Sequence, residues 1–306
     1  MMRWPAYADR LDVVERVLRE HAGGLPGLAP ANAVETLALQ IVASIRREDY
    51  FRLIQGRGPI PAFRADPIDD RFEAELGVVH LLQRGELDEA AWLVFMMTTF
   101  GKPAATGWLR LRDVYGRLGD GVVTWSEVAA SPGLVEEWLA GNWRSVRGRQ
   151  GNHRQYESIR PDAARPIGRG ITQYVEWVVA AGGHARLLAR LVREAGNSPE
   201  SIFDHLFHAL PSTGFARLGR FDWVAMLDRY GIVAATPATA YLDGATGPLR
   251  GARLLVDADT AGPSRPRRLQ SELDVLDAEL GVGMKVLEDA LCNWQKSPTR
   301  FEHFKG

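Results

Sequence analysis

The chain of 306 residues has a single cysteine, Cys292, and only four lysines among its 37 basic residues. One cysteine excludes a disulfide or a thiolate-rich metal site within one chain. No apolar run approaches the ~20 residues that a membrane-spanning helix needs. The N-terminal residues also lack the apolar core of a signal peptide. We therefore expect a cytoplasmic protein with no membrane partner, and a monomer.

Motifs for common cofactors are missing as well. The sequence has no phosphate-binding Walker loop, no GxGxxG after a strand and no HExxH helix. The His/Cys pattern of zinc deaminases is also missing. Its seven histidines are scattered, without the spacing of metal ligands. We predict no metal and no other cofactor.

What the chain does have is helical periodicity. Its apolar fraction of 46% and charged fraction of 25% are those of an ordinary globular protein. Apolar residues recur at helical spacing, whereas strand-like alternation is scarce. The sequence thus predicts an all-α fold, with an N-terminal helical subdomain over 1–98 packed on the remaining helices over 99–306. Helices are expected over 7–21, 32–46, 70–83, 88–100, 132–143, 171–180, 185–195, 202–210, 221–230, 251–256, 268–280 and 282–295.

The basic residues are unevenly distributed, although the net charge is only −1. A near-neutral protein with a basic stripe can hold a polyanion on one face. Solvated surface arginines are the alternative, and charge alone leaves both open. A second basic group is formed by Arg265, Arg267 and Arg268. The stripe between 142 and 170 consists of Arg144, Arg147, Arg149, Arg154, Arg160, Arg165 and Arg169, against Glu157 and Asp162.

The segment 210–219 lies between two expected helices and contains Pro211 and Gly214. A helix, a Pro/Gly turn and a second helix form a helix-hairpin-helix. In this motif glycine lets the backbone approach a phosphate, and the N–H groups of the second helix point at the anion. An ordinary turn between two core helices is the alternative.

A second hairpin is expected over 242–255. Gly244 and Gly247 bracket a short turn, and Pro248 suits the first position of a helix. Gly251 would allow close helix packing. Arg250 and Arg253 could reach a nucleic-acid backbone.

The segment 147–158 gathers amide, imidazole, aromatic and carboxylate side chains in a basic, glycine-rich stretch. A pocket that reads a flipped-out base needs such groups, with amides and carboxylates for its edge and aromatic rings for its face. A polar surface loop is the alternative. The expected pocket residues are Asn152, His153, Tyr156 and Glu157.

Five segments resemble the α-glutamyl/putrescinyl thymine pyrophosphorylase group, whose members are relatives of helix-hairpin-helix DNA glycosylases. The resemblance spans roughly residues 99–306 and implies that this range is the catalytic domain, a helix-hairpin-helix glycosylase-like helical bundle with an N-terminal helical extension. It also implies double-stranded DNA with modified bases as the partner. The segments are Thr99–Pro103, Gly151–Ser158, Gly214–Asp222, Ala245–Leu255 and Leu287–Pro298.

The resemblance implies two activities. Some phage members attach amino acids or polyamines to activated 5-hydroxymethyluracil in DNA. Bacterial relatives resemble anti-phage glycosylases that excise glucosylated hydroxymethylcytosine and leave abasic sites. We favour excision. A non-catalytic DNA-binding module is a third interpretation.

Site residues follow from the resemblance. In this superfamily the catalytic Asp lies shortly after the hairpin, which makes Asp222 the first candidate, then Asp257 and Asp259. Neither hairpin holds a lysine for a Schiff base, so we expect a monofunctional enzyme that uses water. Transfer chemistry would instead need a base, for which Lys102, His153 or Glu157 could serve. The expected DNA contacts are Gly214, Arg217, Gly247, Arg250, Arg149 and Arg154.

Overall fold

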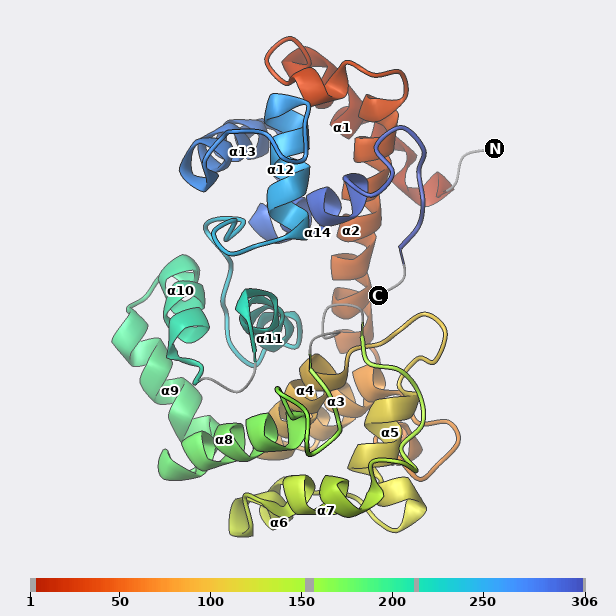
Figure 1. Cartoon of the computed structure of the whole chain (residues 1–306), viewed down its shortest axis with the longest axis vertical. Helices are drawn as coiled ribbons and strands as arrows, with labels where there is room; N and C mark the ends of the chain where they lie inside the picture. Colours follow the sequence, from red (N-terminus) through yellow and green to blue (C-terminus); the bar gives the residue numbers. More distant parts are fainter. Residues whose placement is uncertain (1–3, 152–156, 212–214, 305–306) are drawn as a thin grey trace. The chain divides into compact units, whose positions relative to one another are not determined.

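The structure, a computed structural model, describes residues 4–151, 157–211 and 215–304. In this part of the chain it contains fourteen α-helices and four short 3₁₀-helices, and no β-strand. The predicted all-α fold is confirmed. None of the described helices is both long and apolar enough to cross a membrane. The α-helices, labelled in Figure 1, are α1 Ala8–His21, α2 Ala33–Gln55, α3 Ala74–Gln83, α4 Leu87–Phe100, α5 Leu109–Tyr115, α6 Trp125–Ala130, α7 Leu134–Asn142, α8 Ile167–Ala180, α9 His184–Ala195, α10 Pro199–Ala209, α11 Arg217–Arg229, α12 Gly247–Asp257, α13 Pro266–Leu280 and α14 Met284–Trp294.

The chain divides into two compact units, and the division differs from the expected one. Unit 1 joins residues 1–50 to residues 237–304, and unit 2 comprises residues 51–236. The expected boundary between residues 98 and 99 falls inside α4. Residues 90–100 of α4 are all buried, so the core of unit 2 is built around this helix and cannot end within it.

Unit 1 is a helical core assembled from both ends of the chain. Here α12 packs against α14, against α13 and against the 3₁₀-helix Pro26–Leu28, while α1 packs against α13. Leucines and other aliphatic side chains from these helices form one buried cluster. Two glycines set the spacing around α12. A methyl group on Gly27 would come within 2.0 Å of the Leu254 carbonyl oxygen, and one on Gly251 within 2.3 Å of that of Leu291.

Unit 2 is built around α4. This helix packs against α3, α5, α9 and α11, and from Ala90 to Met97 it is apolar on all sides, as an interior helix must be. Aromatic rings dominate its surroundings. Phe95 stacks on Tyr174 of α8 with 3.5 Å between ring centroids, and Tyr174 meets Trp223 of α11 edge-on. These contacts hold α4, α8 and α11 together.

A buried polar chain crosses this aromatic core. His184, at the start of α9, is only 1% exposed, and its Nε2 lies 3.0 Å from the hydroxyl of Tyr174. Its backbone N–H donates to Asp88 of α4 over 2.5 Å. The His184 Nδ1 lies 3.3 Å from the same carboxylate, outside hydrogen-bond geometry. Burial lowers the pKa of His184, and Asp88 offsets this only in part, so the fold favours neutral imidazole.

Candidate functional site

Two segments that carry the family resemblance lie against each other. Gly151 donates its N–H to the Phe100 carbonyl over 2.9 Å, and the Gln150 side chain donates to the Thr99 carbonyl over 2.6 Å. A methyl group on Gly101 would come within 3.0 Å of the Gly151 Cα. Gly101 also has a φ of 65°, which favours glycine. These two glycines let the C-terminal end of α4 and the 150–151 segment meet directly.

Helix α5 fixes the arginine-rich segment that precedes this contact. Asp113 is 2% exposed and accepts three hydrogen bonds from Arg147, one from its backbone N–H and two from its guanidinium. Arg110 donates to the carbonyls of Arg147 and Gly148 and to the side chain of Gln150. Arg147 is therefore a structural residue rather than a free surface charge.

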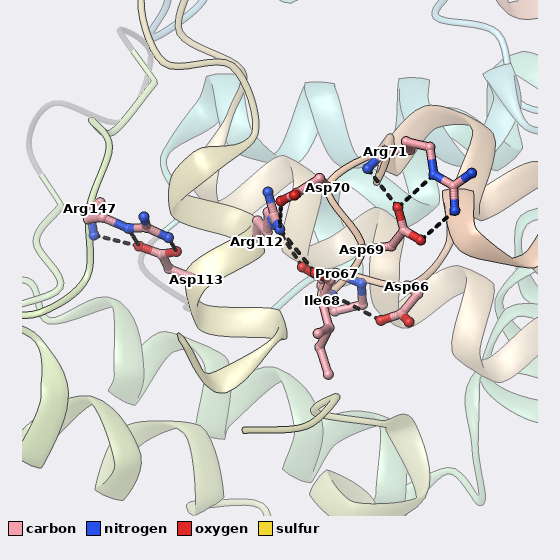
Figure 2. Close-up of polar contacts among 9 residues, drawn as sticks. All are labelled: Asp66, Pro67, Ile68, Asp69, Asp70, Arg71, Arg112, Asp113 and Arg147. Atoms are coloured by element: carbon pink, nitrogen blue, oxygen red, sulfur yellow. Dashed lines mark hydrogen bonds and ion pairs between the residues drawn. The ribbon is translucent and has the colours of Figure 1, made fainter. Parts of the chain in front are cut away.

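The other side of α5 holds the loop 66–71, which Figure 2 shows beside the Arg147 pair. Arg112 donates to the carbonyls of Pro67 and Ile68 and to the carboxylate of Asp70. Asp69 accepts from the backbone N–H and the guanidinium of Arg71, and these hydrogen bonds hold the pKa of Asp69 far below its usual range. One short helix thus organises two loops.

A cavity of about 470 Å³ lies beside the Phe100–Gly151 contact. Its volume falls within the range of small-molecule sites. It is bounded by the C-terminal end of α4, the N-terminal turn of α8 and the segment leading into α11. The lining residues are Phe95, Thr99, Glu157, Ala164, Arg165, Pro166, Ile167, Arg169, Gly170, Ile171, Gln173, Phe215 and Ala216.

The lining combines aromatic rings with hydrogen-bonding and charged groups. The rings of Phe95 and Phe215 lie 5.3 Å apart. Arg165 and Arg169 are exposed; neither guanidinium has a carboxylate partner in the part of the chain that the structure describes, and the amide of Gln173 also lacks a partner there. Two guanidiniums beside the first turn of a helix favour an anionic group.

Among the described residues of the cavity lining, Glu157 supplies the only carboxylate. The structure therefore places one of the four expected pocket residues at this cavity, and its role there stays a prediction. The other three, Asn152, His153 and Tyr156, lie outside the described residues, as does Arg154. Arg149 is exposed, and its backbone N–H donates to Thr106.

The first expected hairpin joins α10 to α11. Arg220 lies in the first turn of α11 and donates to the carbonyls of Phe207, Leu210 and Pro211 at the end of α10. An arginine that satisfies the last carbonyls of a helix fixes the angle at which the next helix leaves. Phe215 and Ala216, which directly precede α11, line the cavity. Gly214 lies outside the described residues, and the Arg217 guanidinium lies over the Phe221 ring.

Asp222 lies in α11 and is half-buried. Its carboxylate has no hydrogen-bond or ion-pair partner among the described residues. It does not line the cavity, but it follows the lining residue Ala216 by six residues, about 9 Å along a helix. Its catalytic role stays a prediction.

The second expected hairpin, in unit 1, is not a helix pair. Irregular backbone precedes α12, and the first described helix before it is α11 in unit 2. Gly247 faces α14, where a methyl group would come within 2.4 Å of the Cys292 sulfur. Its small size is thus explained by helix packing. Arg250 is exposed on α12.

Three of the expected catalytic residues have structural partners. Asp257 accepts hydrogen bonds from the backbone N–H and the hydroxyl of Ser264, over 3.0 and 2.6 Å, and so closes the loop after α12. Lys102 pairs with buried Glu75 over 2.6 Å and lies in a different hollow from Glu157. Asp259 caps the same loop as Asp257 by accepting from the N–H of Ala261.

Several lining residues were not expected from the sequence. Arg165 and Arg169 were grouped with the basic stripe, and Gln173, Phe95 and Phe215 were not selected. One signal could have identified the arginines. The run Arg165-Pro166-Ile167-Gly168-Arg169 places proline just before a helix start, where anions are favoured.

Comparison with known proteins identifies the family of the chain. Neither the curated proteins nor the solved structures contain a match. A family model described as alpha-glutamyl/putrescinyl thymine pyrophosphorylase clade 3 matches residues 32–306, which include all of unit 2 from residue 51 to 236 and most of unit 1, but not α1. The chain belongs to the alpha-glutamyl/putrescinyl thymine pyrophosphorylase family, in clade 3.

Proposed function

We propose that the cavity of unit 2 binds a modified pyrimidine flipped out of DNA and that the protein excises it as a monofunctional glycosylase. The observation that carries the proposal is the composition of the cavity lining: an aromatic wall, an unpartnered amide, two unpaired guanidiniums and one carboxylate. A flipped base needs a ring to stack on and polar groups at its edge. Phe95, Phe215 and Gln173 supply these groups.

The same lining supplies the groups for hydrolysis. The Glu157 carboxylate stabilises the oxocarbenium-like sugar and accepts a proton from the attacking water. Oxygen of that water bonds to C1′, and the electron pair of the broken glycosidic bond leaves with the base. Arg165 and Arg169 bind the phosphates on either side of the flipped nucleotide.

A lysine that could form a Schiff base is missing from the described lining. Water as the nucleophile follows, with an abasic site as the product. The resemblance to anti-phage glycosylases supports a bulky base, such as glucosylated hydroxymethylcytosine, and a role in defence against phage.

Group transfer is the second candidate. Two observations favour it: both Arg165 and Arg169 line the cavity, and the chain belongs to a family named for pyrophosphorylases. An amine would attack the exocyclic methylene of an activated pyrimidine, and pyrophosphate would leave toward the guanidiniums. Glu157 would accept the proton that the amine loses.

The experiment that tests the proposal incubates the protein with DNA containing hydroxymethylcytosine, glucosylated hydroxymethylcytosine or 5-hydroxymethyluracil. Mass spectrometry then analyses both the DNA and the free bases. A released base with alkali-labile sites supports excision. A further reaction contains amines and DNA in which the hydroxyl group of 5-hydroxymethyluracil carries a pyrophosphate. A mass gain on this base supports transfer. DNA that stays unchanged in every reaction contradicts both.

The Glu157→Gln variant tests the role of the carboxylate. We expect the rate of the chemical step to fall by about 10²–10⁴-fold, the range for a positioned acid or base, while DNA affinity is retained. Single-turnover kinetics measures this rate. Asp222→Asn is the comparison variant. If Asp222→Asn loses activity and Glu157→Gln keeps it, the catalytic carboxylate is Asp222.

A further inference from the structure

Unit 1 contains a group of arginines that the cavity does not explain. Arg250 and Arg253 lie three residues apart on α12 and so share one face of the helix. Arg265 precedes α13, and Arg267 and Arg268 lie in its first turn. The Arg253 guanidinium donates to the Ser264 carbonyl over 3.4 Å, which brings the two sets together. We call these five residues the basic patch. Figure 1 shows α12 and α13 adjacent in unit 1.

Two carboxylates next to the basic patch are hydrogen-bonded to other partners. Asp257 accepts from the N–H and hydroxyl of Ser264, and Asp259 accepts from the N–H of Ala261. The first turn of α13 contains no acidic residue. As a result, no guanidinium of the basic patch has a carboxylate partner among the described residues.

Two arginines of α1 contrast with this arrangement. Arg16 pairs with Glu20 and Arg19 pairs with Glu15. Five unpaired guanidiniums close together repel one another. That repulsion is relieved when a polyanion binds.

We propose that the basic patch binds the phosphodiester backbone of duplex DNA, independently of base sequence or modification. Guanidiniums bind phosphate through two parallel hydrogen bonds, which a lysine cannot do. The start of α13 adds the positive end of a helix dipole on the same side. The inference rests on the proposed function in that both take DNA as the substrate, but it concerns the holding of DNA and not its chemistry.

The test measures affinity for an unmodified 20-base-pair duplex as a function of salt concentration. We compare the wild-type protein with Arg267→Gln/Arg268→Gln. Each phosphate contact contributes about −0.9 to the slope of log K against log salt. The double variant should therefore show a slope shallower by about 1.8. Both residues are exposed, so its melting temperature should not change.

Arg16→Gln/Arg19→Gln is the matched control, because it removes the same charge from exposed arginines that already have glutamate partners. It should keep the wild-type slope. Equal slopes for the Arg267/Arg268 variant and the wild type would overturn the proposal. Binding of the same proteins to phosphatidylserine vesicles is measured as well. If the Arg267/Arg268 variant loses binding to these vesicles but not to DNA, the proposal is also overturned and the basic patch is assigned to a membrane surface.

Base release from modified DNA is measured in parallel, at protein concentrations at which the wild-type protein saturates the DNA. If the slope of the Arg267/Arg268 variant is shallower but the wild type releases no base, the DNA-binding role of the basic patch is retained and the proposed chemistry is refuted. If the wild type releases the base but the variant keeps the wild-type slope, the proposed chemistry is retained and the role of the basic patch is refuted.

Discussion

Residues of the same type lie in very different surroundings in this protein. Asp257 closes a loop through Ser264, and Lys102 is neutralised by Glu75. Glu157 lines a cavity, whereas Asp222 has no described polar partner. The sequence could propose these residues, because carboxylates and lysines near glycine-rich turns are typical of catalytic sites. It could not rank them, since the rank depends on partners that are distant along the chain.

His184 makes the stability of unit 2 depend on pH. Burial lowers its pKa in the folded protein, whereas the unfolded chain has a pKa near 6.5. Above pH 7 both states are neutral and the stability is fully present. As the pH falls below about 6.5, the unfolded chain takes up a proton that the folded protein resists, so the free energy of unfolding decreases. Urea unfolding at pH 7.5 and pH 5.5 measures this difference.

The His184→Gln variant provides the comparison. Glutamine keeps a hydrogen-bonding side chain but does not titrate, so the difference between pH 7.5 and pH 5.5 should shrink. Asp88 titrates at lower pH, because the neighbouring His184 side chain and the hydrogen bond from the His184 backbone N–H lower its pKa, and it contributes little within this range. If the variant and the wild type lose the same stability between the two pH values, His184 is not the group responsible.

At the scale of elements, long periodic helices were predicted best. The expected helices over 7–21 and 88–100 agree with α1 and α4 to within a residue. Short helices stabilised by side-chain partners were missed, most notably α5, whose charged residues hold two loops (Figure 2). Helix α2 runs to Gln55, nine residues beyond its expected end, because polar residues after Arg46 hide its periodicity.

The packing of α12 against α14 requires glycine at position 251. In Gly251→Ala the new Cβ would lie 2.3 Å from a backbone oxygen of α14, which cannot move without shifting the helix. We expect a loss of about 1–3 kcal/mol, the usual cost of overpacking a core. Chemical denaturation measures this loss.

Gly141→Ala is the matched control. Gly141 lies in α7, and a methyl group added to it would meet no other atom within 4 Å. Alanine there should stabilise the protein by about 0.4–1 kcal/mol. Unchanged stability in Gly251→Ala would mean that α12 and α14 do not approach this closely.

At the scale of the whole molecule, the family and the all-α class could both be predicted from the sequence. The division into units could not, because it joins the first 50 residues to the last helices. Hydrophobic periodicity identifies a helix but does not show which helices, distant in the sequence, pack against it. The cavity escaped prediction for the same reason, since its walls come from α4, α8 and the start of α11.

The central claim is that this cavity receives the base. Ala164 lines the cavity and is exposed, and Ala189 is exposed on α9 of the same unit but away from the lining. Each is changed to cysteine in a Cys292→Ser background and mixed with duplex DNA in which the exocyclic amine of one cytosine carries an alkyl chain ending in an activated disulfide, so that thiol–disulfide exchange forms the cross-link and releases the activating thiol. The rate of disulfide cross-linking is then measured. We predict that Ala164→Cys cross-links at least ten times faster than Ala189→Cys, and that untethered modified base slows it. Equal rates for the two cysteines would contradict a base-binding role for the cavity.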